Sequence, residues 1–268
     1  MFVEFCVRAS EGSTNRLYLQ EDKFLAQLIP LPSLAEQRRV VGEIEEVAEQ
    51  VGEARAQRKR AEQEMQQMLL GAFRQIAAGA PRRAMGEVAP LVRRPVPVDP
   101  LGAYAELGIR SFGKGTFHKP TLSGVEIGDK RIFCIEPGDL VFSNVFAWEG
   151  AIAVAQSTDA GRVGSHRFMT CVPKAGVATA RFLCFFFLTA DGMDLIGTAS
   201  PGGAGRNRTL GLAALDEIRV PVPAMEEQEW FDELQREVDE LRRLQAESTV
   251  ELDALLPSIL NKAFNGAF

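Results

Sequence analysis

Two segments of this sequence repeat apolar residues at alternating steps of three and four. The first runs from Val40 to Ala72 and the second from Phe231 to Ile259. A narrow seam with this alternation is the pattern of a helix that packs along its length against another helix. With its entry and its end, each helix would cover about 40 residues and would be about 60 Å long, well beyond an average helix. Neither seam could stay exposed, so the helices must pair with each other, with a second copy or with a partner.

The seams contain few polar interruptions, namely Arg58 in the first and Gln245 and Ser248 in the second. Because both segments belong to one chain, we expect them to form an antiparallel pair. Seven apolar residues are predicted to lie in the seam: Ile44, Val51, Met65, Leu234, Val238, Leu241 and Leu252.

The entries into the two helices repeat one another. IPLPSLAEQ at 29–37 corresponds to VPVPAMEEQ at 220–228, with both prolines, the glutamate and the glutamine 191 residues apart. Upstream, GSTNRLYL from residue 12 resembles GAGRNRTL from residue 203 after a shift of one residue. Such internal similarity indicates a repeated structural unit. The unit consists of a tail, a proline-rich strand and a long helix, and its two copies lie on either side of the middle of the chain.

The middle of the chain mixes strand and helix patterns. Residues 125–155 favour short strands broken by Gly-Asp and Pro-Gly-Asp turns, and Thr179–Ile196 favours a buried helix. SPGGAGRNR at 200–208 favours a loop. The expected fold class is therefore α+β, with one mixed domain flanked by two long antiparallel coiled-coil-like helices. The expected segments are a tail at 1–34, a first helix at 35–79, the mixed domain at 80–223 and a second helix at 224–268.

The charge is unevenly distributed although the net charge is −6. Residues 81–223 contain 16 basic and 13 acidic side chains, whereas residues 225–268 contain 4 basic and 11 acidic ones. A mildly basic middle joined to an acidic helix suits a DNA-reading domain joined to a protein-docking element. The alternative is that an excess of three positive charges has no functional meaning.

The remaining composition points to an intracellular protein. The four cysteines lie far apart without a C-x-x-C pair, which indicates reduced thiols rather than disulfides or a zinc site. The sequence shows neither a signal peptide nor a run of about 18 apolar residues that could span a membrane. We therefore expect a cytoplasmic protein without membrane contact.

The P-L-P…E-Q-R-R helix entry, its repeat, and the stretches GDLVFSNVFAWEGA and SPGGAGRNRTL resemble the specificity subunits of type I restriction–modification enzymes. The resemblance covers nearly the whole chain. It implies a target recognition domain that reads half of a bipartite duplex DNA target, and helices that dock the modification (methyltransferase) subunits and, through them, the restriction subunit. Residues 1–32 match only the last part of a recognition domain, so the resemblance is to a half-subunit or truncated form. Such a form would pair with a second copy or with a different half-subunit.

Candidate DNA contacts are residue types that pair with base edges or anchor phosphates. They fall in four clusters of the middle segment. The first is a basic, glycine-rich stretch around residue 112, the second follows a predicted strand, the third surrounds a histidine, and the fourth ends the glycine-rich loop. These residues are Arg110, Ser111, Lys114, Asn144, Trp148, His166, Arg167, Arg206, Asn207 and Arg208. The alternative readings are a charged hairpin, a core tryptophan, a hydrogen-bonded structural histidine and a solvated turn.

Motifs for catalysis are absent from the sequence. It contains neither a phosphate-binding G-x-x-x-x-G-K-[ST] loop nor a Rossmann G-x-G-x-x-G, and no Asn-Pro-Pro-aromatic motif of amino-methyltransferases. Neither of the two histidines stands in a metal or triad spacing. We expect a non-enzymatic subunit without cofactor or metal. The competing interpretations are a coiled-coil adaptor without DNA specificity and an inactive gene fragment.

Overall fold

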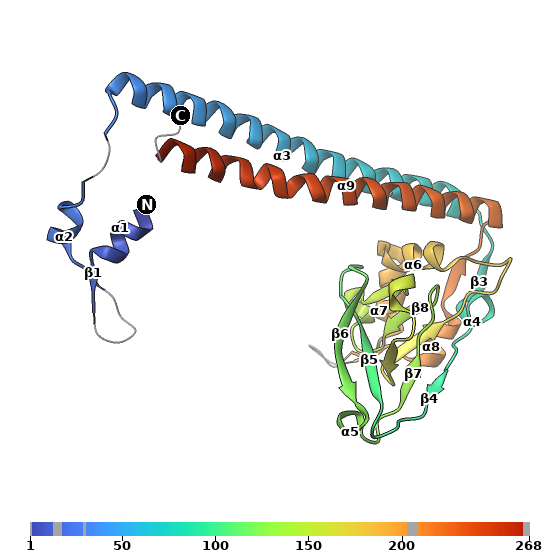
Figure 1. Ribbon diagram of the computed structural model, residues 1–268. Coiled ribbons are helices and arrows are strands. Elements are labelled where there is room, and N and C mark those ends of the chain that lie inside the picture. Colours follow the sequence, from blue (N-terminus) through green and yellow to red (C-terminus); the bar gives the residue numbers. More distant parts are fainter. Residues whose placement is uncertain (1, 13–17, 29–30, 203–207, 265–268) are drawn as a thin grey trace. The chain divides into compact units, whose positions relative to one another are not determined.

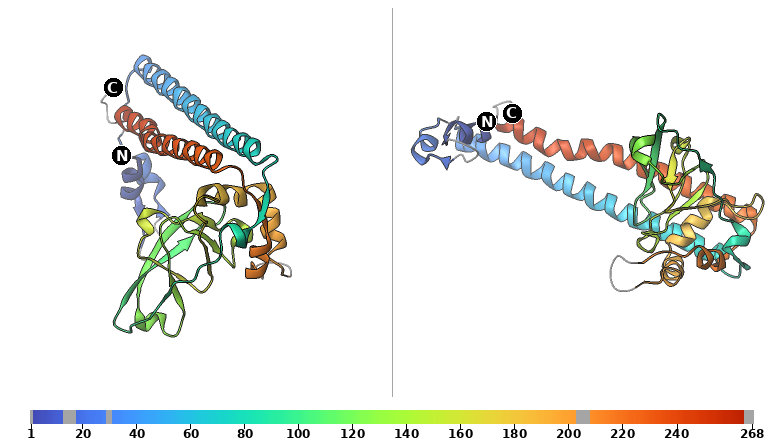
Figure 2. Two further views of the ribbon diagram at one scale, coloured as in Figure 1. Left: turned by 90° about the vertical axis from the view of Figure 1, so that its right-hand side faces the viewer. Right: turned by 90° about the horizontal axis from the view of Figure 1, so that it is seen from below.

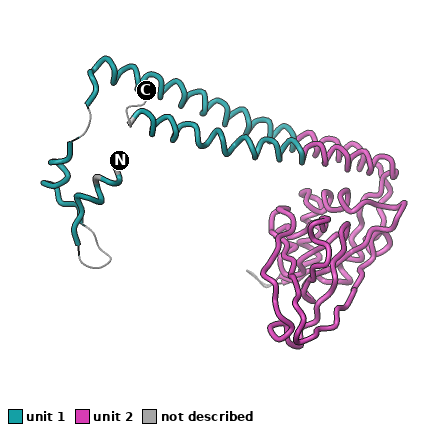
Figure 3. The backbone as a smooth tube through the Cα atoms, in the orientation of Figure 1, with its two compact units in different colours: residues 1–66, 239–268 teal, residues 67–238 magenta. Residues whose placement is uncertain are grey.

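The computed structural model describes residues 2–12, 18–28, 31–202 and 208–264. The chain divides into two compact units, one comprising residues 1–66 and 239–268 and the other residues 67–238 (Figure 3). We call them unit 1 and unit 2. Two long helices, α3 (Leu34–Ala77) and α9 (Met225–Phe264), each belong partly to both units. The short elements at the start of unit 1 are α1 (Phe2–Arg8), β1 (Ser10–Glu11), β2 (Tyr18–Leu19) and α2 (Glu21–Leu25).

Unit 2 contains the mixed domain. Its strands are β3 (Arg82–Ala84), β4 (Pro95–Val96), β5 (Ala103–Ile109), β6 (Thr116–Ser123), β7 (Ile132–Cys134), β8 (Leu140–Ser143), β9 (Ile152–Val154), β10 (Val163–Ser165), β11 (Phe168–Cys171) and β12 (Arg219–Pro221). Its shorter helices are α4 (Met85–Val88), α5 (Gly124–Ile127), η1 (Ala147–Glu149), η2 (Ser157–Asp159), α6 (Ala180–Leu188), α7 (Ala190–Thr198) and α8 (Leu212–Glu217).

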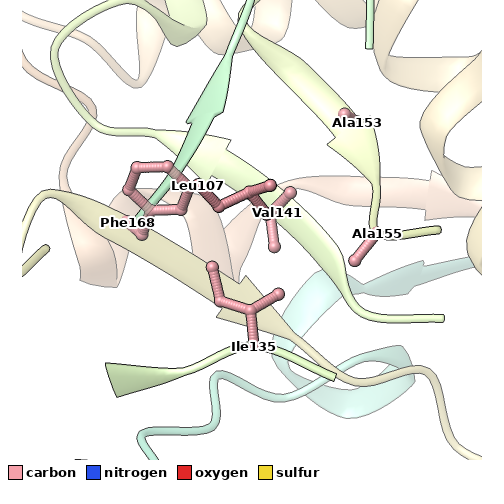
Figure 4. Close-up of a cluster of buried hydrophobic side chains, with 6 residues drawn as sticks. All are labelled: Leu107, Ile135, Val141, Ala153, Ala155 and Phe168. Carbon is pink, nitrogen blue, oxygen red and sulfur yellow. The ribbon is translucent and has the colours of Figure 1, made fainter. Parts of the chain in front are cut away.

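The strands of unit 2 form a five-stranded sheet in the order β4-β7-β10-β5-β6 and a three-stranded sheet in the order β11-β8-β9 (Figure 1). A further antiparallel pair joins β12 to β3. Apolar side chains of both larger sheets meet in one core cluster, in which Leu107 of β5 faces Val141 of β8 and Phe168 of β11 (Figure 4). The core therefore holds the two sheets together beneath the loops that connect their strands.

A cluster of phenylalanines joins α6 to the portions of the long helices that belong to unit 2. The ring of Phe73 on α3 lies 5.2 Å from that of Phe182 on α6 and 5.8 Å from that of Phe231 on α9. Each of these side chains is buried, and burying one phenylalanine contributes about 1.5–3 kcal/mol. This cluster anchors the start of α9 and the end of α3 to the mixed domain.

Within unit 1 the two long helices lie side by side and antiparallel (Figures 1 and 2). Side-chain hydrogen bonds join the helices, and in three of the pairs the partner on α9 moves back along the chain as the partner on α3 advances. The pairs are Arg55 with Asp253 at 2.5 Å, Arg58 with Thr249 at 2.9 Å and Arg242 with Glu62 at 2.8 Å. The expected α+β fold, a mixed domain flanked by two long antiparallel helices, is confirmed.

The helix seam differs from the expectation at one side of α9. Val51 and Val238 are buried, and Ile44, Met65, Leu234 and Leu252 are half-buried. Leu241, predicted to lie in the seam, is instead 51% exposed. The buried or half-buried line on α9 runs through Val238, Arg242, Gln245, Thr249, Leu252 and Leu256. From Val238 the observed line advances first by four residues, to Arg242, whereas the expected seam advances by three, to Leu241. Because successive residues on a helix point about 100° apart, Leu241 lies outside the seam.

The polar interruptions of the two seams meet each other. The guanidinium of Arg58 donates to the hydroxyl of Ser248 and to that of Thr249, both at 2.9 Å. All three residues are half-buried. A polar layer in an apolar seam disfavours every alignment in which one partner is left unpaired. We therefore expect this layer to set the register of the helix pair.

The internal repeat of the sequence is a repeat of structure. The helices α3 and α9 begin 191 residues apart, the same separation as the matched prolines and glutamines. At the first helix Gln37 donates from Nε2 to the carbonyl of Pro32 at 2.8 Å. At the second helix Gln228 donates from Nε2 to the carbonyl of Pro223 at 2.9 Å. This shared hydrogen bond explains why each helix entry combines a proline with a glutamine five residues later.

Further hydrogen bonds match between the two tails. In each tail a serine hydroxyl donates to the carbonyl four residues earlier, and a backbone amide donates to an alanine carbonyl. In the first tail these are Ser10 to Cys6 and Gln20 to Ala9; in the second they are Ser200 to Ile196 and Gly211 to Ala199. The helices α2 and α8 follow at equivalent positions. The described parts of the two tails therefore share these helices and hydrogen bonds.

The two copies differ in burial. Leu210 in the second tail is 1% exposed, whereas the equivalent Leu19 in the first tail is 50% exposed. Gln228 is fully buried and also bonds the backbone of Thr179 and Val177, each at 3.1 Å. These additional partners belong to the mixed domain of unit 2. The second copy is therefore built into a complete domain.

One predicted element is wrong in detail. The single helix expected over Thr179–Ile196 is two helices, α6 and α7, because the chain leaves the helical conformation at Thr189. The Thr189 side chain accepts a hydrogen bond from the amide of Gly192 and so caps the second helix. An uninterrupted apolar pattern does not reveal a break whose cap is a single threonine.

Candidate nucleic-acid interface

Four connecting segments of unit 2 meet around the turn between β8 and β9. They are residues 110–115 between β5 and β6, residues 144–150 between β8 and β9, residues 165–167 between β10 and β11, and residues 208–210 before α8. We call these four segments the loop group. Its members are separated by up to about 100 residues in the sequence, and backbone hydrogen bonds connect each of the other three to the central 144–150 segment.

The 110–115 segment is held by backbone hydrogen bonds. The amide of Phe112 donates to the carbonyl of Glu149 at 2.8 Å, and that of Gly113 donates to the carbonyl of Gly150 at 2.9 Å. The hydroxyl of Ser111 adds a bond to the Glu149 carboxylate at 3.1 Å. Ser111 therefore has a loop-to-loop partner, while Lys114 stays exposed.

Arg110 also belongs to this segment and is exposed. Its guanidinium carbon lies 5.0 Å from the centre of the Phe117 ring, and Nη1 donates to the carbonyl of Thr116 at 2.6 Å. These contacts order the side chain without neutralising its charge. An ordered, exposed guanidinium is suited to bind a phosphate or a base edge.

The 208–210 segment reaches the same turn from another direction. The guanidinium of Arg208 lies 5.5 Å from the centre of the Trp148 ring, and the amide of Leu210 donates to the carbonyl of Asn144 at 2.8 Å. Trp148 is half-buried and donates from Nε1 to the carbonyl of Val145 at 2.9 Å. Its ring therefore has a structural place in the turn and a face toward Arg208.

Asn144 has an unusual feature at this junction. Its side-chain oxygen is buried and finds no hydrogen-bond partner among the described residues. A buried polar atom without a partner costs about 1–3 kcal/mol. A functional role is one explanation for such an atom, and Asn144 lies where the loops of the candidate site converge.

The 165–167 segment completes the group. The amide of Asn144 donates to the carbonyl of Arg167 at 2.9 Å, and Nη1 of Arg93 donates to the carbonyl of His166 at 3.4 Å. The Arg93 guanidinium lies 4.6 Å from the centre of the Phe133 ring. Burial, together with the nearby charge of Arg131, lowers the pKa of Arg93. Arg93 therefore brings a positive charge next to His166.

Arg93 was not singled out by the sequence analysis. Its signal is the doublet Arg93–Arg94, but the two residues have different roles. Arg94 makes two hydrogen bonds to the buried carboxylate of Asp139, at 2.7 and 3.0 Å, and this pairing raises its pKa. Arg93 contacts the loop group instead. The sequence alone does not distinguish the arginine of the internal ion pair from the half-buried arginine at the loop group.

The predicted contact residues are thus brought together where the structure describes them. Those that are exposed are Arg110, Lys114, His166, Arg167 and Arg208. Those that are half-buried are Ser111, Asn144 and Trp148. Arg206 and Asn207 lie outside the described residues. Cations, an aromatic ring and amide groups on one loop group are the chemistry that binds phosphates and base edges.

Other polar clusters of unit 2 have internal roles. The buried carboxylate of Asp159 accepts hydrogen bonds from the amide of Gln156 and the hydroxyl of Thr116, both at 2.8 Å, and contacts His118 at 2.9 Å. Burial alone would raise the pKa of Asp159, but these hydrogen bonds hold it below its usual value. Among the described residues, no group of three or more metal-ligating side chains is suited to hold a metal ion.

The long helices are too polar to span a bilayer, and no other described helix qualifies. No protein-family profile matches the sequence, and no curated protein sequence is significantly similar to it.

Two solved structures share the fold. One is the crystal structure of the HsdS subunit from Thermoanaerobacter tengcongensis, with 22% identity and a TM-score of 0.54, matching 99% of this chain and 68% of that chain. The other was reported for the complex assembly and conformational transition of the type I R-M system, with 22% identity and a TM-score of 0.63, matching 100% of this chain and 69% of that chain. The chain therefore has the fold of type I specificity subunits.

Proposed function

We propose that this chain is a sequence-specific DNA-recognition subunit of a type I restriction–modification complex, without catalytic activity of its own. The observation that carries the proposal is the convergence of the loop group. Three separate segments bring Arg110, Arg167 and Arg208 beside the 144–150 turn. In the fold shared with HsdS, such a domain would read half of a bipartite target in duplex DNA.

A contact-by-contact test uses arginine-to-alanine variants. Arg208→Ala and Arg167→Ala should each weaken binding of the assembled complex to its duplex by about 1–3 kcal/mol if they read bases. If either arginine instead anchors a phosphate, its alanine variant should weaken binding to all sequences and lower the salt dependence of binding. The matched control is Arg219→Ala on β12, which is exposed and lies outside the loop group. Equal binding by all three variants would exclude the loop group from the interface.

The helix pair is the proposed docking site for the modification subunits. In unit 1, Leu241 and Leu244 on α9 are 51% and 48% exposed, and Val41 on α3 is similarly exposed. Exposed apolar side chains on a long helix pair are typical of a surface that a partner covers. The excess of acidic residues over 225–268 would complement a basic partner.

Paired variants test this docking surface. Leu241→Asp and Leu244→Asp should prevent co-purification with the modification subunits while the far-UV circular dichroism of the chain stays unchanged, because neither residue is buried in the seam. If the chain is instead an adaptor without DNA specificity, the variants would also lose the partner, but the wild-type chain would show no salt-dependent DNA retention. Unchanged co-purification by both variants would place the docking surface elsewhere.

The described residues carry one mixed domain, and a bipartite target needs two. We propose that a second copy of this chain or a different half-subunit supplies the other. Two identical chains related by a two-fold axis would read two inverted copies of one half-site, whereas a different half-subunit would give an asymmetric target. The symmetry of the methylated motif distinguishes these two assemblies.

A further inference from the structure

Phe112 stands out by its backbone and its exposure. Among the described residues it is the one non-glycine residue with a positive φ, at 62°, and its side chain is 74% exposed. The left-handed conformation is unfavourable for a side chain of this size. An exposed aromatic ring gains little from burial, so folding alone does not account for a phenylalanine at this position.

The backbone beneath the ring is rigidly placed. Besides the bonds from Phe112 and Gly113 to the 144–150 turn, the amide of Arg110 donates to the carbonyl of Gly115 at 2.9 Å. Gly150 has a φ of 77°, and a Cβ added there would lie 3.3 Å from the Phe112 amide nitrogen. A Cβ added at Gly113 would approach the Leu188 side chain to 2.9 Å. The loop backbone is thus closely held, which fixes the point from which the Phe112 side chain extends.

Two exposed cations belong to the loop that carries the ring. The Lys114 ammonium lies 5.9 Å from the centre of the Phe112 ring, and the exposed Arg110 belongs to the same loop. A protein partner would equally use an exposed phenylalanine, but it would not require one cation at the ring and a second in the same loop. An apolar ring in a loop that carries cations is the arrangement that places a wedge against a base step while the charges bind the adjacent phosphates.

We propose that Phe112 inserts as a wedge at a base step of the bound duplex and unstacks it, so that it contributes to target choice through the deformability of that step. This inference rests on the proposed function and goes beyond it by assigning a specificity-determining residue. Pyrimidine–purine steps unstack most easily, so they are the expected position of insertion. The residue would read the sequence without a hydrogen bond to a base.

The test uses the full chain assembled with its modification subunits. The probe is a duplex carrying the methylated motif, with 2-aminopurine placed at successive positions and dyes at both ends. Wild-type complex should raise 2-aminopurine fluorescence at one step of each half-site that this chain reads and should bend the duplex. Phe112→Ala should abolish both signals and weaken binding by about 5- to 150-fold, the range for loss of one stacking contact. Phe112→Trp should keep both signals.

Two controls separate function from folding. Phe112→Gly relieves the strained φ, so the variant should melt about 2–4 °C higher than wild type while it loses the fluorescence signal. Leu101→Ala removes a 94% exposed apolar side chain just before β5 and should leave DNA binding and bending unchanged.

The outcomes are distinct. DNA binding and unstacking by Phe112→Ala at the wild-type level would overturn the wedge while leaving the proposed function intact. Loss of the modification subunits from the Phe112→Ala complex would identify the ring as a protein contact and would also overturn it. Absence of DNA binding by the wild-type complex would instead contradict the proposed function.

Discussion

Replacing Val51 by aspartate probes the helix pair where unit 1 is most tightly packed. Val51 is 3% exposed, so the variant loses the burial of a valine side chain, worth about 1.5–3 kcal/mol. It also forces a carboxylate into the seam without a partner, which typically costs about 3–5 kcal/mol. Because the aspartate can relax toward solvent, the two costs do not add fully, and we expect a loss of about 4–6 kcal/mol.

The same helix offers a matched control. Val41→Asp makes an identical chemical change at a side chain that is 51% exposed, and it should alter stability by no more than about 0.5 kcal/mol. Urea unfolding of both variants, followed by far-UV circular dichroism, gives the comparison. If Val51→Asp unfolds at the same urea concentration as Val41→Asp, the antiparallel seam is wrong.

Three further predictions follow from the structure. Gln228→Ala should cost about 1–3 kcal/mol because it leaves buried backbone groups unpaired, whereas Gln37→Ala at the equivalent half-buried position should cost less; equal thermal shifts would contradict the difference in burial between the repeats. Asp159 has a lowered pKa in the folded state, so its stabilisation is present above its unfolded value of about 3.8 and is lost as the pH falls through the folded value. Asp159→Asn should therefore flatten the acid limb of a stability–pH profile, and an unchanged limb would refute this. In a double-mutant cycle, Arg58→Ala and Thr249→Ala should be coupled by at least about 0.5 kcal/mol, and strict additivity would show that the polar layer contributes nothing.

The sequence predicted the architecture because its strongest signals are periodic and local. The 3/4 spacing and the proline-rich entries define where both long helices begin, and the constant separation of 191 residues extends to individual hydrogen bonds. The side of α9 that faces α3 was less predictable. Leu241 is more apolar than Arg242, yet Arg242 lies nearer the seam because its long side chain reaches Glu62. Hydrophobicity alone does not account for such flanking ion pairs.

The candidate site was predictable as residue types but not as an assembly. Arg110, Trp148 and Arg208 stand out in the sequence, whereas their convergence on one turn depends on long-range strand pairing. The backbone strain at Phe112 has no sequence signature, since φ is imposed by hydrogen bonds to the distant Glu149–Gly150 backbone. Tertiary contacts, rather than local preference, decide both features.

The central claim, that this chain reads DNA for a methyltransferase, is tested most directly by methylome sequencing. Cells would carry the modification subunits with the wild-type chain, with the Arg208→Ala variant, or without the chain. We expect a bipartite methylated motif that requires the chain and that becomes degenerate at one position, or weakly methylated, in the Arg208→Ala cells. A motif that persists unchanged without this chain, or the absence of any motif that depends on it while the modification subunits are active, would contradict the account.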